Sequence, residues 1–375
     1  MPAGVADALY NNDVGLGDFD QDGDLDAMVV RANWLSGDNV LLMNQGHAQG
    51  GTEGYFIAYP TPGYLAESSN TWHFALGDLN GDGGLDAYLA TWQGTADQIL
   101  FNQGPSGTGV TFSTVAISET GAAGSSDVAL GDLDRDGDLD AFVSNWGAGP
   151  NQVVINQGGA QGGTEGAFIA TAADPSELAS ASTRAALGDV DGDGDLDALV
   201  TNWGTTSPQV YVNQGGDQNG TEGAFVAHTV SAPTSDSRAM ALADLDGDGD
   251  LDGFIANWNT VPNQFLWNQG GVQNGTEGVF IAANAPGIAN MVVDVAVGDI
   301  DSDGDLDILL ASDTAINEIL VNGGGLQGGT EGTFTLGATF AGVYCALALG
   351  DLDGDGTTPA VGANGLPNHD GLLLI

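Results

Sequence analysis

Residues 131–140 read GDLDRDGDLD, and close copies of this stretch recur along the whole chain. The other copies are GDFDQDGDLD (17–26), GDLNGDGGLD (77–86), GDVDGDGDLD (188–197), ADLDGDGDLD (243–252), GDIDSDGDLD (298–307) and GDLDGDGTTP (350–359). From Asp18 to Asp351, the first aspartates of successive copies are 60, 54, 57, 55, 55 and 52 residues apart. A nearly fixed period of this size is typical of propellers and other repeat arrays.

Each repeat contains four short apolar segments with the composition of strands. Strand A precedes the acidic loop (VALGD, 128–132), and strand B follows it (LDALVTNW, 196–203). Strand C is NQVVINQG (151–158), and strand D follows a glycine-rich turn (GTEGAFIA, 163–170). Valine, isoleucine and phenylalanine in short runs bounded by glycine, asparagine and aspartate indicate strands, and no segment keeps a helical period.

Four strands in about 55 residues predict an all-β fold, a seven-bladed β-propeller with four-stranded blades. We expect a single domain over residues 1–375, with blades starting near residues 13, 73, 127, 184, 239, 294 and 345. The weaker alternative is a β-solenoid, which would need shorter coils.

The two ends of the sequence suggest how the ring closes. The seventh repeat ends at Ile375 without a strand D. Residues 4–10 precede the first strand A and have no partner within the first repeat. We predict that residues 4–10 supply the outer strand of the last blade, which would remove an exposed sheet edge. A neighbouring molecule or downstream sequence could instead fill this place.

The acidic loops follow the pattern D-x-[DN]-x-D-G-x-x-D, numbered here as loop positions one to nine. Oxygen ligands at alternate positions suit a hard cation such as Ca²⁺, and glycine at position six permits a sharp turn. We predict carboxylate ligands at positions one, three, five and nine and the backbone carbonyl of position seven, whose side chain should point outward. Zinc or copper would require nearby histidine or cysteine.

The predicted metal-site residues, loop by loop, are Asp18, Asp20, Asp22, Asp24 and Asp26; Asp78, Asn80, Asp82, Gly84 and Asp86; Asp132, Asp134, Asp136, Asp138 and Asp140; Asp189, Asp191, Asp193, Asp195 and Asp197; Asp244, Asp246, Asp248, Asp250 and Asp252; Asp299, Asp301, Asp303, Asp305 and Asp307; and Asp351, Asp353 and Asp355. The second loop is weaker, since it has an asparagine and a glycine in place of two aspartates. In the seventh loop, Pro359 replaces the ninth-position aspartate. We therefore expect six well-formed calcium sites and a doubtful seventh.

The charge of the chain excludes several classes of partner. It has 51 acidic residues and only 4 lysines and arginines, for a formal net charge of −47. Such a chain should repel nucleic acid and anionic membranes and attract cations. It also has no apolar run near 18 residues, so we expect no membrane insertion.

The cellular location is less well specified by the sequence. Cys345 is the only cysteine, so no internal disulfide can form, and this is compatible with either redox environment. The first residues lack the basic start and apolar stretch of a signal peptide, so a signal has been removed or the chain is part of a longer one. We expect an extracellular, secreted or cell-surface protein.

The loops and their flanking strands resemble the FG-GAP/VCBS repeats of integrin-α-type propellers, which include bacterial secreted proteins and fungal lectins. The resemblance covers all seven repeats and implies a seven-bladed propeller with Ca²⁺ in the A–B loops. Two departures matter: the Phe-Gly-Gly-Ala-Pro signature is absent, and the C–D segment has the unusual form NQGGxQGGTEGxF. Integrin-like ligand binding and lectin activity therefore do not transfer to this chain.

Chain parity separates two faces of the predicted ring. The A–B loops share one face with the C–D turns, which carry Glu53, Glu165, Glu222, Glu277 and Glu331. We interpret these glutamates as solvated turn residues, although they could approach the metal loops.

The opposite face carries a repeated tryptophan at the end of strand B, at Trp34, Trp92, Trp146, Trp203 and Trp258. These side chains either fill the wedge between blades or offer a stacking surface to a ligand. The D–A connectors, at residues 59–73, 116–127, 171–184, 229–238 and 283–292, vary most between repeats and lie on the same face. We expect a protein or glycan partner there.

No catalytic constellation is recognisable. The four histidines, His47, His73, His228 and His369, stand at non-equivalent places, and the calcium pattern accounts for the paired carboxylates. We therefore expect that the protein is not an enzyme. Two hypotheses remain: an extracellular binding, adhesion or self-assembling module, which could form a homo-oligomer or filament, and a carbohydrate-binding lectin.

Overall fold

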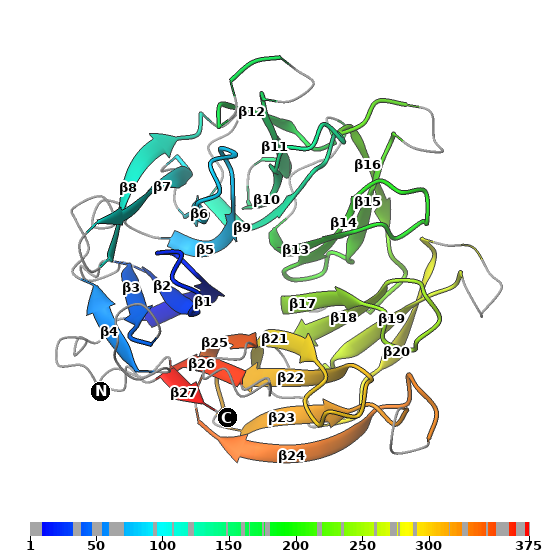
Figure 1. Ribbon diagram of the computed structural model, residues 1–375. Helices are drawn as coiled ribbons and strands as arrows, with labels where there is room; N and C mark the ends of the chain where they lie inside the picture. Colours follow the sequence, from blue (N-terminus) through cyan, green and yellow to red (C-terminus); the bar gives the residue numbers. More distant parts are fainter. Residues whose placement is uncertain are drawn as a thin grey trace.

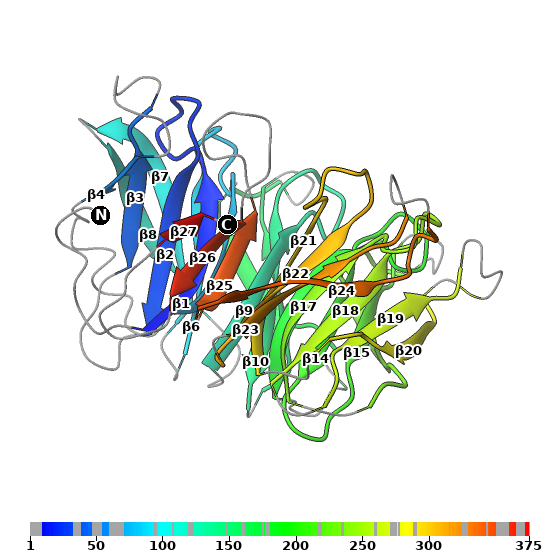
Figure 2. The ribbon, with the colours of Figure 1, turned by 90° about the horizontal axis from the view of Figure 1, so that it is seen from below.

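In the computed structural model, seven antiparallel sheets surround a common axis (Figure 1). The residues that the structure describes are 10–32, 39–46, 55–59, 71–92, 96–106, 109–118, 124–147, 149–158, 162–164, 166–174, 176, 181–215, 220–233, 236–258, 261–270, 276, 278–287, 291–314, 316–324, 329–342, 344–349, 360–364 and 372–374. Seen after a quarter turn, the strands run roughly along the thickness of the ring (Figure 2). Within these residues, no helix is long and apolar enough to cross a membrane.

The two inner strands of each blade flank the acidic loop. The innermost strands are β1 (Tyr10–Gly17), β5 (Thr71–Gly77), β9 (Gly124–Gly131), β13 (Ser182–Gly188), β17 (Ser237–Ala243), β21 (Val292–Gly298) and β25 (Tyr344–Leu349). The second strands are β2 (Asp26–Ala32), β6 (Asp86–Thr91), β10 (Asp140–Trp146), β14 (Asp197–Asn202), β18 (Asp252–Asn257), β22 (Asp307–Ser312) and β26 (Ala360–Asn364).

The two outer strands complete most blades. The third strands are β3 (Val40–Asn44), β7 (Gln98–Ser106), β11 (Gln152–Asn156), β15 (Gln209–Asn213), β19 (Gln264–Asn268), β23 (Ile316–Val321) and β27 (Leu372–Leu374). The outermost strands are β4 (Phe56–Tyr59), β8 (Gly109–Ala116), β12 (Phe168–Ala172), β16 (Phe225–Thr229), β20 (Phe280–Asn284) and β24 (Thr335–Ala341). Consecutive strands pair in chain order in every sheet.

The all-β propeller prediction is confirmed, with one correction to the strand count. Six sheets have four strands, whereas the sheet of β25, β26 and β27 has three among the described residues. Tyr10 lies in β1 and pairs with Ala32, so it belongs to the first blade. Residues 4–9 lie outside the described residues, and closure of the last blade by this segment stays a prediction.

The hydrophobic core lies between blades. Second strands such as β6, β14 and β22 are buried along their whole length, because neighbouring sheets cover both of their faces. Phe19 of the first blade packs edge-to-face on Phe112 of the second, with ring centroids 6.3 Å apart. Val14 and Ala346 share a cluster that joins the first and seventh blades and closes the ring.

A largely buried polar cluster occupies the axis. It is built, in five of the seven blades, from the residue five places before the first loop aspartate: Asp13, His73, Asp127, Arg184 and Asp294. His73 Nδ1 lies 3.1 Å from Asp13 Oδ2, and the Arg184 guanidinium lies 3.7 Å from Asp127 and 3.6 Å from Asp294. Asp294 also accepts a hydrogen bond from the Leu347 N–H at 2.7 Å. Side chains at the axis thus link blades that are distant in sequence.

Candidate metal centres

The A–B loops have an unusual backbone at positions four and six. Position six is glycine in all six described loops, with φ between 84° and 105°. Position four also has positive φ, even where the residue is Gln21 (59°), Arg135 (60°) or Ser302 (62°). Two left-handed residues in three curl the chain tightly, so the odd-numbered side chains gather on one side of the loop.

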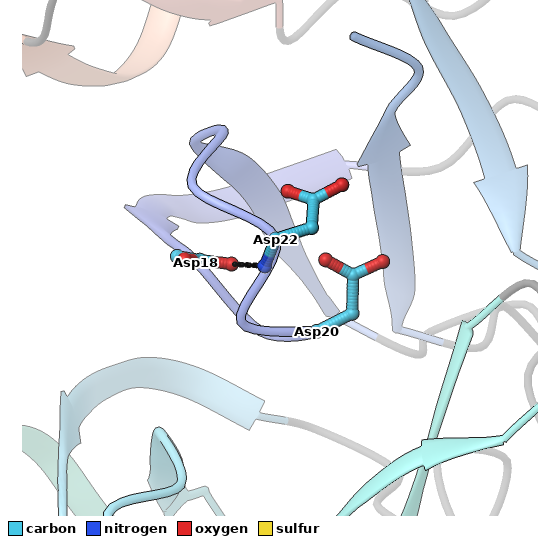
Figure 3. A group of neighbouring side chains, drawn as sticks. All are labelled: Asp18, Asp20 and Asp22. Carbon is cyan, nitrogen blue, oxygen red and sulfur yellow. Dashed lines mark hydrogen bonds between the residues drawn. The ribbon is translucent and has the colours of Figure 1, made fainter. Parts of the chain in front are cut away.

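The first aspartate of each loop holds this curl in place. In the first loop, the Asp22 N–H donates to Asp18 Oδ1 at 3.0 Å (Figure 3). The Gly23 N–H donates to Asp18 Oδ2, also at 3.0 Å. The Asp24 N–H in turn donates to Asp22 Oδ1 at 3.0 Å. The same bonds recur in the other described loops. Each of these loops is therefore held in a curled shape by its own hydrogen bonds.

Carboxylates converge in five of the described loops. In each group, one oxygen per residue lies within 4.8 Å of the others. The groups are Asp18, Asp20 and Asp22; Asp132, Asp134 and Asp136; Asp189, Asp191 and Asp197; Asp244, Asp246 and Asp248; and Asp299, Asp301 and Asp303. Figure 3 shows the first group. In the second loop, Asn80 replaces the central carboxylate, and the seventh loop lies outside the described residues.

Buried oxygens in these groups are arranged to receive a cation. Asp22 Oδ2 and Asp248 Oδ2 are buried and accept no hydrogen bond in the described part of the chain. Burial together with the neighbouring Asp136 and Asp132 raises the pKa of Asp134 to about 6. Carboxylate-only donor sets suit Ca²⁺, and a bound cation would offset both the desolvation and the mutual repulsion.

The ninth-position aspartates have a second role that the sequence pattern did not reveal. Asp197 is fully buried; its Oδ2 accepts from the Val190 N–H at 3.1 Å and its Oδ1 from the Asn213 N–H at 2.8 Å. Burial is the main cause that raises the pKa of Asp197 to about 7. Asp197 is also the ninth-position residue that joins one of the five groups, so ligation by this position is compatible with its structural role.

The prediction for position seven is wrong in one respect. The side chains of Asp24, Asp195 and Asp305 are 3%, 0% and 2% exposed, whereas we expected them to point outward. The reason is the C–D turn of the same blade, which covers them: a Cβ added to Gly215 would meet Asp195 Oδ2. The carboxylates of Asp195 and Asp305 therefore lie inside the blade beneath that turn, whereas Asp138 and Asp250 are half-buried.

An asparagine in strand C joins neighbouring loops and was missed by the sequence analysis. Asn213 Nδ2 donates to the Leu133 carbonyl of the preceding blade at 2.8 Å and to the Leu196 carbonyl of its own loop at 3.2 Å. Its Oδ1 accepts from the Gly223 N–H at 3.0 Å. The signal for this role was the repeated Asn-Gln pair that ends strand C.

The C–D glutamates approach the metal loops more closely than solvated turn residues would. Glu222 Oε1 lies 3.8 Å from Arg135 Nη1 of the preceding blade, although its side chain stays 39% exposed. The Glu331 carboxylate lies against Gly247 of the preceding blade's loop. Glu53, Glu165 and Glu277 lie outside the described residues.

Half-buried tryptophans form a continuous arc on the opposite face. Ring centroids are 4.9 Å apart for Trp72 and Trp92, 5.6 Å for Trp92 and Trp146, and 5.4 Å for Trp146 and Trp203. The Arg238 guanidinium then lies 4.9 Å from the Trp203 ring and 4.1 Å from the ring of Trp258. Trp34 lies outside the described residues.

Two members of this arc, Trp72 and Arg238, were not identified from the sequence. Trp72 and Arg238 are the unpaired residues of irregularities in β5 and β17, where the strand register shifts by one residue. A bulge re-aims a side chain, and here it turns both toward the tryptophan face. The repeated tryptophan is therefore neither an isolated wedge nor a freely exposed ring, because each described ring packs on a neighbour.

Comparisons with known proteins agree with this architecture. Residues 18–89, 78–143, 189–255, 244–310 and 299–358 match the family described as the FG-GAP-like repeat. No curated protein matches the chain.

Several solved structures share the fold at low sequence identity. An Agrocybe aegerita lectin, described for specific recognition of non-reducing terminal N-acetylglucosamine, has a TM-score of 0.55 and 17% identity, over 98% of this chain and 91% of the lectin chain. A chain from the complex of BBS1N with ARL6DN has a TM-score of 0.53 and 10% identity, over 98% of this chain and all of the other. At these identities the likeness concerns the fold alone.

Proposed function

This chain belongs to the FG-GAP-like repeat family, and we propose that it is a secreted, calcium-stabilised propeller that acts as a binding, adhesion or self-assembling module. The observation that carries the calcium part is the convergence of three carboxylates within 4.8 Å in five separate loops. Oxygen donors alone, on a loop curled by two left-handed residues, favour Ca²⁺ over transition metals.

The role of the ion is structural in this proposal. Each loop joins the two innermost strands of a blade, and its carboxylates are partly buried, so their charges repel one another. A bound ion removes that repulsion and adds its binding free energy to folding.

Metal removal tests the calcium part. In excess EDTA the melting temperature should fall sharply and recover when CaCl₂ is restored, and elemental analysis of the dialysed protein should find calcium. Asp134→Asn removes a group member and should lower both calcium content and melting temperature, whereas Asp313→Asn at an exposed position outside the loops should change neither. An unchanged melt in EDTA together with a metal-free protein would contradict the proposal.

The rim of the ring supports the self-assembling form. The outermost strands of the six four-stranded sheets present apolar side chains at 39–55% exposure: Ile57, Val115, Ile169, Val226, Ile281 and Leu336. Among the described residues, each outermost strand also has one edge without a partner strand, and such an edge can add a strand from another chain. Sedimentation velocity over a range of concentrations should then show multimers, and Ile169→Lys with Ile281→Lys should dissociate them.

Lectin activity is the second candidate, favoured by the tryptophan arc. Its rings are half-buried and contiguous, and indole faces stack on sugar rings. A glycan array probed with the wild type and with a Trp146→Ala, Trp203→Ala double variant tests it. Binding that is lost in the double variant and retained in Trp146→Phe supports the lectin; a blank array with concentration-dependent multimers favours assembly.

A further inference from the structure

One junction between adjacent blades contains its own cation. At the junction of the third and fourth blades, Arg135 Nη1 lies 2.8 Å from Asp195 Oδ1 and 3.8 Å from Glu222 Oε1. Asp195 comes from position seven of the fourth blade's loop and is fully buried, whereas the Arg135 side chain is 45% exposed. The guanidinium reaches across from position four of the preceding loop and offsets the charge of this acidic pair.

At the junction of the first and second blades, the sequence has neither the acidic pair, which is the position-seven aspartate with the C–D glutamate, nor a basic residue at position four. Position seven of the second loop is Gly84, and position four of the first loop is Gln21. The neutral Gln21 Nε2 donates to the Gly83 carbonyl at 2.8 Å. At these two junctions, the residue at position four therefore matches the charge that the next blade presents to it.

At the junction of the fifth and sixth blades, the acidic pair is present without a side-chain cation. Asp305 is 2% exposed, and both of its carboxylate oxygens are buried without a hydrogen bond of good geometry in the described chain. Asp305 and Glu331 flank Gly324: a Cβ added there would lie 2.6 Å from Asp305 Oδ2 and 2.8 Å from Glu331 Cβ. Position four of the facing loop is Gly247, which has no side chain to supply a charge.

The Glu331 carboxylate occupies the space that a side chain at position 247 would need. A Cβ at Gly247 would overlap this carboxylate. Glu331 therefore lies at the place from which Arg135 extends at the other junction, and it lies near the buried Asp305, which no side-chain cation neutralises among the described residues. Two carboxylates in such a setting require a cation or a proton.

We propose that a second class of calcium site lies between the fifth and sixth blades, where a Ca²⁺ ion held by Asp305 and Glu331 replaces the guanidinium of Arg135. The site lies beside the sixth A–B loop centre, because Asp305 interacts with Asp303 of that group, but neither Asp305 nor Glu331 is a member of the five carboxylate groups. Carboxylates of two chain segments and water supply the oxygen ligands that Ca²⁺ requires. The ion would join blades, whereas each A–B loop ion stabilises one blade.

Ion counting by native mass spectrometry in excess CaCl₂ tests the proposal with a matched pair of variants. Glu331→Gln should bind about one ion fewer per chain than the wild type, because it halves the charge of the unfilled pair. Glu222→Gln changes the equivalent glutamate at the Arg135 junction and should leave the ion count unchanged. Equal counts for Glu331→Gln and the wild type, or an equal loss in both variants, would overturn the proposal.

The reciprocal variant removes the built-in cation. Arg135→Gln copies the residue at position four of the first loop and should gain about one ion per chain, since it leaves Asp195 and Glu222 uncompensated. An unchanged count for this folded variant would argue against an exchangeable cation at these junctions. A high wild-type count that Glu331→Gln does not reduce contradicts this site alone, whereas a wild-type count of zero contradicts the A–B loop centres as well.

Discussion

Asn213 shows how a single side chain can hold two blades together. It is fully buried, and its amide makes hydrogen bonds to the Leu133 carbonyl, the Leu196 carbonyl and the Gly223 N–H. Asn213→Ala would leave these buried backbone groups without that partner, so we expect the free energy of unfolding to fall by about 2–4 kcal/mol. Urea denaturation measures the change.

The control for this substitution is Val226→Ala, which shortens a side chain on the outermost strand of the same blade at 39% exposure. A surface truncation of this kind should alter the free energy of unfolding by less than about 0.5 kcal/mol. If the two variants were equally stable, the asparagine would not be the link that its hydrogen bonds suggest.

At the axis, Asp294 makes stability depend on pH. Burial is the main cause that raises the pKa of Asp294 to about 6 from the ordinary 3.8. The folded state therefore favours the protonated carboxyl, and its stabilising contribution is complete below about pH 4 and is lost as the pH rises through about 6. Asp294→Asn cannot ionise, so its stability relative to wild type should improve by on the order of 2 kcal/mol between about pH 4 and pH 7.

Urea denaturation of both proteins at a series of pH values measures this difference, with excess CaCl₂ present to saturate the proposed loop sites. Asp313→Asn, at an exposed position, serves as the control and should show a flat difference from wild type. A flat curve for Asp294→Asn as well would mean that the axial carboxyl is not protonated in the folded state.

At the scale of one element, the A–B loop depends on its two left-handed residues unequally. Gly249 at position six has φ +100°, and no atom lies within 4 Å of an added Cβ, so Gly249→Ala acts through backbone strain alone. We expect a loss of about 1–2 kcal/mol and weaker calcium binding. Isothermal titration with CaCl₂ and thermal melting measure the two effects.

Position four provides the comparison. Gly192 has φ +76°, and the same position is occupied by Gln21, Arg135 and Ser302 in other loops at φ of about 60°. Gly192→Asn should therefore leave calcium affinity nearly unchanged. Equal damage from both substitutions would show that the loop tolerates no side chain at either position.

An element could be predicted from the sequence when the residues that determine its structure lie close together in the chain. The loop was predictable because alternate aspartates and one glycine are read within nine residues. The buried side chain of Asp195 was not, because the turn that covers it lies about twenty residues further along. Asn213 and the Trp72–Arg238 arc depend on partners in other blades, so no local pattern could specify them.

At the scale of the whole molecule, the sequence repeats made the ring of sheets predictable. The features that differ between blades could not be predicted in the same way. Seven copies at nearly equal spacing imply seven equivalent sheets, and cores shared between adjacent blades follow because each sheet must bury two faces. The axial cluster, in which Arg184 lies close to both Asp127 and Asp294, breaks that equivalence. Its residues occupy one repeated position but differ from blade to blade, so only the closed ring shows that they pair.

The net charge of −47 gives a prediction for the molecule as a whole. The loop carboxylates are concentrated on one face, and five Ca²⁺ ions in the five described groups would change the formal charge to −47 + 10 = −37. Raising ionic strength from about 0.01 M to about 0.1 M shortens the Debye length from about 30 Å to about 10 Å and so screens repulsion across that face. In EDTA, added NaCl should therefore raise the melting temperature clearly, and in excess calcium the rise should be smaller.

KCl at the same ionic strength distinguishes screening from binding of a particular ion, because the Debye length does not depend on which monovalent salt is used. Both salts should shift the melting temperature of the metal-free protein equally. If salt raised the melting temperature as much with calcium as without it, the loop carboxylates would not be the source of the destabilising repulsion. The destabilising repulsion would then reside in acids outside the loops, and calcium would act through local geometry instead of charge.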